Sequence, residues 1–263
     1  MLAVARDLAI AAAERLEGLR SGLLEQERKA DHSLVTNADR AADRLIREGL
    51  RRAFPDHAIL TEESGFAGSP SAEFVWVVDP LDGTRAYVKG IAGYSVMIGL
   101  LRERKPYAGV VVDPWEGHVY EALRGAGAFH ILKSKRTRVR VSGRRTFSEM
   151  PLVTSTGFPT FWMSDLKARL PCPWVTPINS VGIKVGLLVR QVADIYLNHH
   201  RVHYWDTCAP QIILEEAGGI MTLLDGRPLV YDRHDEFQHP APTLATNGTR
   251  HKELLSLLAS PAV

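Results

Sequence analysis

The sequence predicts a globular protein of the mixed α/β class. Three observations predict this class: apolar residues at helical spacing near both ends of the chain, a strand-rich middle, and a length of 263 residues with 45% hydrophobic content. A chain of this length can bury a large core without disulfides or a structural metal ion, and its composition excludes disordered and collagen-like chains. We therefore expect one large domain or two closely packed ones.

Helices are expected in both halves of the chain. Residues 2–20 and 38–53 place apolar side chains on one face, with good helix formers between them. The second helix ends before Pro55, because a residue that precedes proline disfavours the helical region. Further helices are expected over residues 181–190, 207–217 and 248–258.

Strands are expected between these helices. Phe74–Val78 is a continuous apolar run, as in a strand that is buried on both faces. The polar stretch 142–149 suggests a boundary between residues 1–145 and 146–263, as two halves of one compact unit. Runs bounded by Pro and Gly predict further strands over residues 94–101, 108–113, 118–123 and 194–197.

A basic stretch at residues 133–145 contains an Arg-Val-Arg-Val alternation. We interpret it as a solvated edge strand, because Lys and Arg commonly protect exposed sheet edges. Steering of anions and binding of nucleic acid are the alternatives, and the second would give an affinity that depends steeply on salt. The net charge of +2 removes the usual electrostatic argument for a dedicated nucleic-acid binder.

The sequence predicts a cytoplasmic protein without a membrane partner. Cys172 and Cys208 are too few for a disulfide framework and lack metal-ligand spacing, which fits a reducing compartment. The apolar run 8–13 is shorter than a signal-peptide core, and no run approaches the ~20 apolar residues of a membrane span.

Acidic residues follow several apolar runs, and strand ends are where sites of layered α/β proteins are usually built. Any one of these carboxylates could instead cap a turn or a helix. The string 79–84, Asp-Pro-Leu-Asp-Gly-Thr, is more specific. Its two carboxylates are three residues apart around a rigid proline and can turn toward one point, as a hard cation such as Mg²⁺ requires. Gly83 and Thr84 then offer backbone N–H groups and a hydroxyl to an anion.

Four elements of the chain resemble, in order, those of the inositol monophosphatase superfamily of magnesium-dependent, lithium-sensitive phosphatases. The elements are Val35-Thr36-Asn37-Ala38-Asp39, Ile59-Leu60-Thr61-Glu62-Glu63-Ser64, Val77-Val78-Asp79-Pro80-Leu81-Asp82-Gly83-Thr84, and Trp205-Asp206 followed by Glu216-Ala217-Gly218-Gly219. The resemblance implies a layered αβαβα sandwich of the inositol monophosphatase and fructose-1,6-bisphosphatase type.

The resemblance also implies roles for individual residues. Two or three Mg²⁺ ions would be bound by Glu62, Asp79, Asp82, Asp206 and the Leu81 carbonyl, and would activate a water molecule. Asp39 and Thr84 would orient and deprotonate that water, with Glu63 as a supporting carboxylate. The substrate would contact Gly83, Thr84, Ser180, Lys184 and Asp206. Converging carboxylates without Lys or Arg partners repel one another, so bound cations are also expected on physical grounds.

The expected substrate is a small phosphorylated metabolite. Trp205-Asp206-Thr207-Cys208-Ala209-Pro210 is similar to the 3′(2′),5′-bisphosphate nucleotidases, and Lys184 suits a second phosphate. Inositol enzymes carry a glutamate about seven residues before the Trp-Asp aspartate, where this chain has Asn198-His199-His200. The leading expectation is therefore hydrolysis of adenosine 3′,5′-bisphosphate to AMP and phosphate. Inositol 1-phosphate, fructose 1,6-bisphosphate and histidinol phosphate are the alternatives.

The sequence also bears on a binding module and on a zinc site. A non-catalytic binding module on the same fold would have lost metal ligands, and all of them are present in this sequence. His199, His200 and His203 could suggest zinc, but no fourth ligand is spaced nearby, so we expect structural or substrate-edge roles. Monomers and homodimers both occur in the family, so either state is expected.

Overall fold

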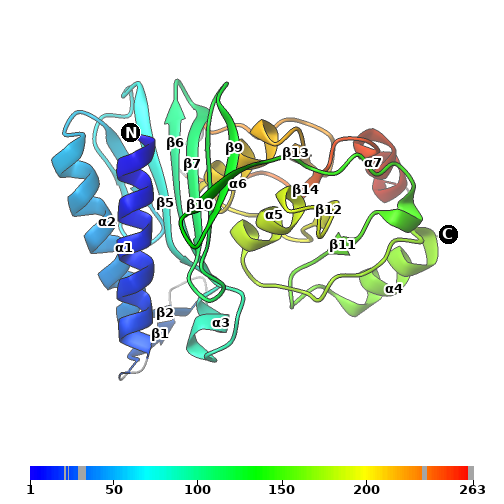
Figure 1. Cartoon of the computed structure of the whole chain (residues 1–263), viewed down its shortest axis with the longest axis horizontal. Helices are drawn as coiled ribbons and strands as arrows, with labels where there is room; N and C mark the ends of the chain where they lie inside the picture. Colours follow the sequence, from blue (N-terminus) through cyan, green and yellow to red (C-terminus); the bar gives the residue numbers. More distant parts are fainter. Residues whose placement is uncertain (21, 23, 29–33, 233–235, 260–263) are drawn as a thin grey trace.

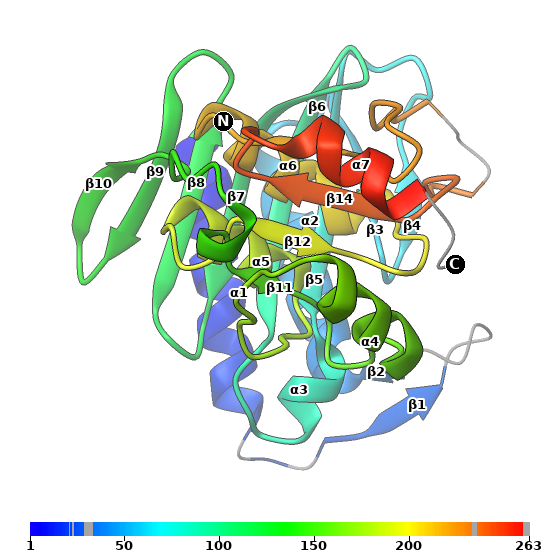
Figure 2. The same ribbon diagram turned by 90° about the vertical axis from the view of Figure 1, so that its right-hand side faces the viewer.

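The computed structural model describes residues 1–20, 22, 24–28, 34–232 and 236–259, and it consists of five layers (Figures 1 and 2). An eight-stranded sheet lies between two pairs of helices, and a four-stranded sheet lies between the second and a third pair. The predicted αβαβα sandwich is confirmed. The helix pairs are α1 (Leu2–Arg20) with α2 (Asn37–Ala53), α5 (Val181–Val189) with α6 (Tyr204–Glu216), and α4 (Thr160–Arg169) with α7 (His251–Ala259).

The large sheet contains the predicted strands of the N-terminal half. Its pairs are antiparallel except for β3 and β5, which run parallel. The basic strand β10 pairs only with β9 and is the edge strand that the sequence predicted. In spatial order the strands are β10 (Lys135–Val139), β9 (Gly127–Leu132), β8 (His118–Leu123), β7 (Lys105–Asp113), β6 (Ser95–Arg102), β5 (Phe74–Asp82), β3 (Ala58–Thr61) and β4 (Gly65–Ala67).

The small sheet belongs to the C-terminal half, and most of it was missed by the sequence analysis. Its strands have only two to four residues, too few for a clear alternation of apolar and polar positions. In spatial order they are β11 (Leu152–Val153), β12 (Ile195–Leu197), β14 (Thr243–Thr246) and β13 (Ile220–Leu223). The shorter remaining elements are β1 (Gln26–Arg28), β2 (Leu34–Thr36), α3 (Thr84–Val88) and a 3₁₀ turn at Phe147–Glu149.

Two helix predictions need correction. Helix α4 was missed because its sequence is not amphipathic, and Phe161 on it is 74% exposed. Helix α6 begins at Tyr204 instead of Thr207. The earlier start arises because the Asp206 carboxylate accepts a hydrogen bond from the backbone N–H of His203 and so caps the first turn. Asp206 therefore lies inside the helix and not before it.

Two glycines bring α6 unusually close to the large sheet. A Cβ atom at Gly99 would lie 2.5 Å from Cys208 Sγ, and one at Gly109 would lie 2.7 Å from the Ala209 carbonyl oxygen. Such distances are far below van der Waals contact, so any larger residue would push the helix away. The glycines therefore set the height of α6 above β6 and β7, and with it the position of Asp206.

The structure also bears on the cysteines and on membrane association. Cys172 and Cys208 are buried free thiols, as expected from the sequence. Within the described part of the chain, no helix has the length and apolar character needed to cross a bilayer.

Candidate active site

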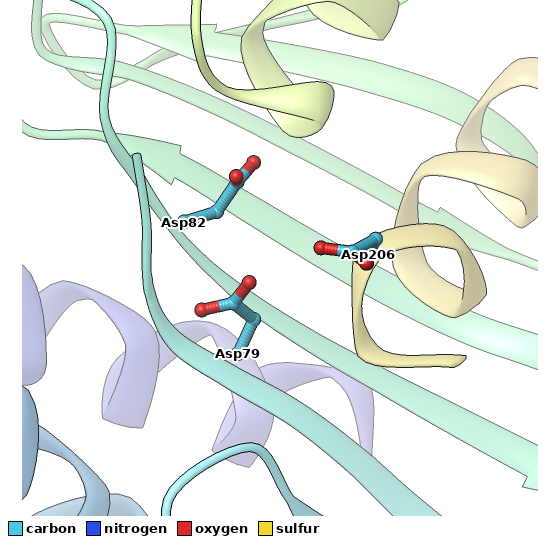
Figure 3. A group of neighbouring side chains, drawn as sticks. All are labelled: Asp79, Asp82 and Asp206. Carbon is cyan, nitrogen blue, oxygen red and sulfur yellow. The ribbon is translucent and has the colours of Figure 1, made fainter. Parts of the chain in front are cut away.

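A bulge in β5 brings Asp79 and Asp82 to the same face of the large sheet. Asp79 pairs with Met97 and Asp82 pairs with Ser95, so three steps along β5 oppose two steps along β6. Side chains alternate faces along a regular strand, and residues three apart would point in opposite directions. The extra residue in the bulge turns both side chains to the same face. Figure 3 shows the side chains of Asp79 and Asp82 gathered in one place with that of Asp206.

Asp82 is held by the N-terminus of α5. Its Oδ2 accepts hydrogen bonds from Ser180 Oγ at 2.7 Å, from the Val181 N–H at 2.6 Å and from the Gly182 N–H at 3.2 Å. The helix N-terminus carries partial positive charge, which stabilises the carboxylate. Ser180 also caps the helix, because its Oγ accepts from the Ile183 N–H. A residue of the N-terminal half is thus fixed by a helix of the C-terminal half.

Asp206 and Asp79 are held in a similar way. Asp206 Oδ2 accepts from the His203 N–H at 2.6 Å in the first turn of α6, and Asp79 Oδ1 accepts from the Leu81 N–H at 3.0 Å. One oxygen of each of the three aspartates is therefore bonded to backbone N–H groups. No hydrogen bond from the described residues reaches the other oxygen of Asp79, Asp82 or Asp206.

The residues Asp79, Asp82 and Asp206, called here the aspartate triad, fit a bound cation. Each can offer one oxygen, and these oxygens lie within 4.8 Å of one another. Burial, followed by the charges of Glu62 and the neighbouring aspartates, raises the pKa of Asp79 well above its ordinary value. Burial and the charges of Asp82 and Glu62 do the same for Asp206. Three buried, mutually repelling carboxylates with available oxygens match the oxygen-donor preference of Mg²⁺.

The remaining predicted metal ligands line the same cavity of about 470 Å³, called here the inner cavity. Glu62 follows β3, and its backbone N–H bonds the Val78 carbonyl at 3.1 Å. Leu81 is buried and contributes its backbone carbonyl, which accepts a hydrogen bond from Thr84 Oγ1 at 3.1 Å. The structure thus brings together the aspartate triad, Glu62 and Leu81, as the sequence predicted.

Glu63 does not line the inner cavity. The pKa of the neighbouring Arg40 is raised mainly by its hydrogen bond with Glu27, and Glu63 adds a smaller contribution through its charge. Its role as a supporting carboxylate stays a prediction. The turn that carries both glutamates is fixed by Asp43, whose Oδ2 accepts from Ser64 Oγ at 2.6 Å. Sequence analysis missed Asp43, since a single acidic residue within a helix gives no signal.

Asp39 and Thr84 lie beside each other, as predicted. Asp39 occupies the first turn of α2, where its Oδ2 accepts from the Thr36 N–H at 2.8 Å in a capping box. Its Oδ1 lies 3.1 Å from Thr84 Oγ1, and the hydroxyl can donate either there or to the Leu81 carbonyl. Burial is the main cause that raises the pKa of Asp39, and its hydrogen bonds to Thr36 and Thr84 oppose the shift.

Gly83 shapes the backbone next to Thr84. Its φ of +94° belongs to the left-handed region that favours glycine, and a Cβ there would lie 2.4 Å from the Gly93 carbonyl oxygen. Gly83 and Thr84 both line the inner cavity. Ser180 is completely buried, with its hydroxyl bonded to Asp82 and to Ser95 Oγ. Its predicted contact with substrate stays a prediction, and its observed role is to hold Asp82.

Lys184 is completely buried within α5. Its Nζ lies 2.7 Å from Ser155 Oγ, 3.1 Å from the Ile178 carbonyl oxygen and 2.9 Å from the Asn179 carbonyl oxygen, and 4.7 Å from the centre of the Tyr196 ring. Burial lowers its pKa to about 8. These acceptors use all three protons of the ammonium group. Direct contact with a substrate phosphate stays a prediction, and this geometry favours a supporting role instead.

A second cavity of about 600 Å³, called here the outer cavity, adjoins the first and shares Asp82 and Asp206 with it. Arg85, Lys89 and Asn198 line it. The sequence analysis did not assign a function to Arg85 or Lys89. Their position directly after the Asp-Gly-Thr string was the available signal.

The histidine cluster does not form a metal site in the described part of the chain, where the aspartate triad is the one group with converging ligand atoms. The rings of His199 and His200 meet edge to face, with centroids 4.7 Å apart. His203 instead stacks on Trp205 at 4.5 Å. Trp205 also lines the inner cavity.

Comparison with known proteins identifies the family. The sequence profile of the inositol monophosphatase family matches residues 1–260. The chain is 33% identical over 243 residues to an inositol-1-monophosphatase from Synechocystis, covering 89% of this chain and 80% of that one. It is 31% identical over 209 residues to the Nus factor SuhB of Pasteurella multocida, covering 77% and 76%. A 3′(2′),5′-bisphosphate nucleotidase CysQ from Aggregatibacter actinomycetemcomitans is 26% identical over 215 residues, covering 81% and 80%.

The solved structures agree with the sequence comparison. The inositol monophosphatase of Anabaena superimposes with a TM-score of 0.80 at 30% identity, covering 99% of this chain and 96% of that one. The fold and its carboxylate centre define a metal-dependent phosphatase. The chain belongs to the inositol monophosphatase family, and it is therefore an enzyme that hydrolyses phosphoric monoesters.

Proposed function

We propose that this enzyme is a 3′(2′),5′-bisphosphate nucleotidase, which converts adenosine 3′,5′-bisphosphate to AMP and phosphate. The observation that most supports this assignment is the set of residues that line the outer cavity. Asn198, His199 and His200 line it where a polyol-binding carboxylate would be expected, and among the described residues its carboxylates are Asp82 and Asp206 of the proposed metal centre. The resemblance of residues 205–210 to the nucleotidases and the CysQ relative add support.

The metal centre would be formed by Glu62, Asp79, Asp82, Asp206 and the Leu81 carbonyl, with two or three Mg²⁺ ions. When bound, Mg²⁺ neutralises the carboxylates, polarises the phosphate and lowers the pKa of a water molecule. The residues of the chain supply the remaining chemistry. Gly83 and Thr84 contribute a backbone N–H and a hydroxyl beside the phosphate.

Asp39 and Thr84 would move the proton. Thr84 Oγ1 donates its proton to Asp39 Oδ1 and accepts one from the attacking water, so that the water oxygen forms its bond to phosphorus as the ester bond breaks. The raised pKa of Asp39, caused chiefly by burial, suits a carboxylate that must accept a proton near neutral pH. The leaving oxygen takes a proton from solvent and departs as the hydroxyl of AMP.

Inositol 1-phosphate is the second candidate. It is favoured by the 33% identical relative that carries the name inositol-1-monophosphatase. Both substrates would use the same metal centre and the same proton transfer, and they differ only in the group that fills the outer cavity.

Phosphate release with Mg²⁺ tests the proposal, with adenosine 3′,5′-bisphosphate and inositol 1-phosphate compared at equal low concentration. A preference of ~100-fold for the nucleotide, about 2.7 kcal/mol of transition-state discrimination, is expected. A preference for inositol 1-phosphate would replace the nucleotidase assignment and keep the metal mechanism. Release from neither would direct the test to fructose 1,6-bisphosphate and histidinol phosphate.

A further inference from the structure

The outer cavity is bordered by two cations on one short helix. Arg85 lies in α3 and Lys89 is its C-terminal cap, so their spacing of four residues places them on one face. Both side chains are exposed, and both line the outer cavity. Among the described residues, neither has a carboxylate within ion-pair distance.

Several arginines of the described chain pair with acidic residues, whereas Arg85 and Lys89 do not and lie beside the outer cavity. Arg124 pairs with Glu215 at 2.8 Å, and Arg144 pairs with Asp194 at 3.0 Å. Two unpaired cations beside a cavity that also borders the metal centre leave their charge available to an anion. Arg85 reaches both cavities, whereas Lys89 lines only the outer one.

An independent observation concerns Asn198, which lines the same cavity and is 0% exposed. Its Oδ1 accepts a hydrogen bond from the His200 N–H, but its Nδ2 has no partner in the described residues. The hydroxyl of Tyr196, another lining residue, also lacks a partner there. A buried donor without an acceptor is costly, and a ligand rich in acceptor oxygens would satisfy it.

The cation for such a ligand must come from a residue other than Lys184. All three protons of its ammonium group already have acceptors in the floor of the site. The cations Arg85 and Lys89 and the Nδ2 group of Asn198 are therefore available to an anion in the outer cavity.

We propose that Arg85 and Lys89, with Asn198 as a hydrogen-bond donor, bind a second phosphate carried by the leaving group of the substrate. The inference rests on the proposed function, because it assumes that the reacting phosphate lies at the metal centre. It makes Arg85 and Lys89 specificity-determining residues that select bisphosphates over monophosphates.

The test compares adenosine 3′,5′-bisphosphate with adenosine 3′-phosphate, which has the same reacting phosphate but lacks the second one. In the wild-type enzyme the ratio of their kcat/KM values should favour the bisphosphate. The double substitution Arg85→Gln with Lys89→Gln should lower this ratio about 10- to 100-fold, chiefly through the KM of the bisphosphate. Lys89→Gln alone should lower it by a smaller factor.

Two matched variants strengthen the test. Arg51→Gln with Arg52→Gln removes two exposed charges at the far end of α2 and should leave the ratio at the wild-type value. Asn198→Asp keeps the acceptor for His200 but replaces the unpaired donor with a negative oxygen, so it should raise the KM of the bisphosphate. Thermal melting of each variant checks that the fold is intact.

The outcomes separate this inference from the proposed function. A wild-type enzyme that hydrolyses neither nucleotide would reject the nucleotidase assignment, and fructose 1,6-bisphosphate against fructose 1-phosphate would then test the second-phosphate site. A double variant that keeps the wild-type ratio would overturn the inference. Equal losses on both nucleotides would also overturn it, because Arg85 would then act on the reacting phosphate.

Discussion

The inner and outer cavities differ in how their polar groups are held. In the inner cavity, the carboxylates of Asp79, Asp82 and Asp206 each accept hydrogen bonds from backbone N–H groups at helix or strand ends. In the outer cavity, Arg85 and Lys89 are exposed and have no acidic partner among the described residues, and the Nδ2 group of Asn198 has no acceptor there. The fold itself thus supplies hydrogen-bond partners for the carboxylates of the inner cavity, whereas polar groups of the outer cavity stay available to a ligand, as we propose.

The largest effect is expected when one charge is removed from the aspartate triad of the inner cavity. Asp82→Asn changes little volume and keeps an acceptor for the α5 N-terminus. Loss of residues behind metal ligands typically costs 10- to 100-fold, so loss of a ligand should lower kcat by more than about 100-fold. Initial rates across a Mg²⁺ titration measure the effect, with circular dichroism as the control for folding. A normal Mg²⁺-dependent rate would remove Asp82 from the metal centre.

The next largest effect is expected at the proton-transfer pair. Thr84→Val removes the hydroxyl that contacts Asp39 Oδ1 and should lower kcat about 10²- to 10⁴-fold. Thr84→Ser keeps the hydroxyl and serves as the matched control, with a much smaller loss. Single-turnover kinetics at saturating Mg²⁺ measure both. Similar rates for the Val and Ser variants would argue against proton transfer through this hydroxyl.

A third experiment tests whether Lys184 supports the site or contacts the substrate. Lys184→Met would leave the acceptors on Ser155, Ile178 and Asn179 unpaired, so it should lower the free energy of unfolding by about 3 kcal/mol. Because Lys184 supports residues beneath the site, its loss should lower kcat/KM by the same factor for adenosine 3′,5′-bisphosphate and adenosine 3′-phosphate. A selective loss on the bisphosphate would restore the contact with substrate that the sequence predicted.

The smallest effect concerns the metal-free enzyme. The pKa of Asp206 is raised by burial and then by Asp82 and Glu62, so its charged form is costly in the folded state. A carboxyl whose pKa rises on folding binds more protons when folded, so stability should fall as the pH increases above its ordinary value of 3.8. Asp206→Asn should therefore stabilise the metal-free protein near neutral pH by about 1 to 2 kcal/mol while it impairs catalysis.

Thermal melting in a chelator between pH 5 and pH 8 measures this effect. The wild-type Tm should decrease across the range, the Asp206→Asn Tm should decrease less, and added Mg²⁺ should raise the wild-type Tm. A variant that is less stable than the wild type at pH 8 would show that the hydrogen bond to His203 outweighs the repulsion among the carboxylates.

Part of the inner cavity could be predicted from the sequence because its chemistry lies in the short, continuous string 79–84. Asp79 and Asp82 lie on either side of a proline, and Asp39 sits within a capping pattern that is local to α2. Their convergence on one point was expected, but the bulge that produces it could not be predicted, since it depends on the register with β6. The start of α6 was misplaced for a similar reason, because Asp206 was interpreted as a ligand and not also as a cap.

Most residues that line the outer cavity could not be predicted from the sequence because they come from separate segments of the chain. Arg85 lies in the five-residue helix α3 after the signature string and Lys89 caps that helix, whereas Asn198 follows a three-residue strand more than a hundred residues later. Only the packing of α5 and the small sheet brings these segments together. Lys184 is the converse case: the sequence singled it out, its ammonium group is enclosed by one hydroxyl and two carbonyl oxygens, and its contact with substrate stays a prediction.

The bulge in β5 also affects how this enzyme can change over evolutionary time. Val77 packs toward α5 and α6, while Val78 and Leu81 pack toward α1 and α2, and the extra residue is what returns Asp82 to the side of Val77. Deleting one codon between Asp79 and Asp82 would turn that carboxylate into the apolar core beneath α1 and α2. Exchanging Leu81 for another apolar residue would keep its carbonyl in place. The number of residues between the two aspartates is therefore a tighter structural constraint than the identity of the apolar residue at position 81.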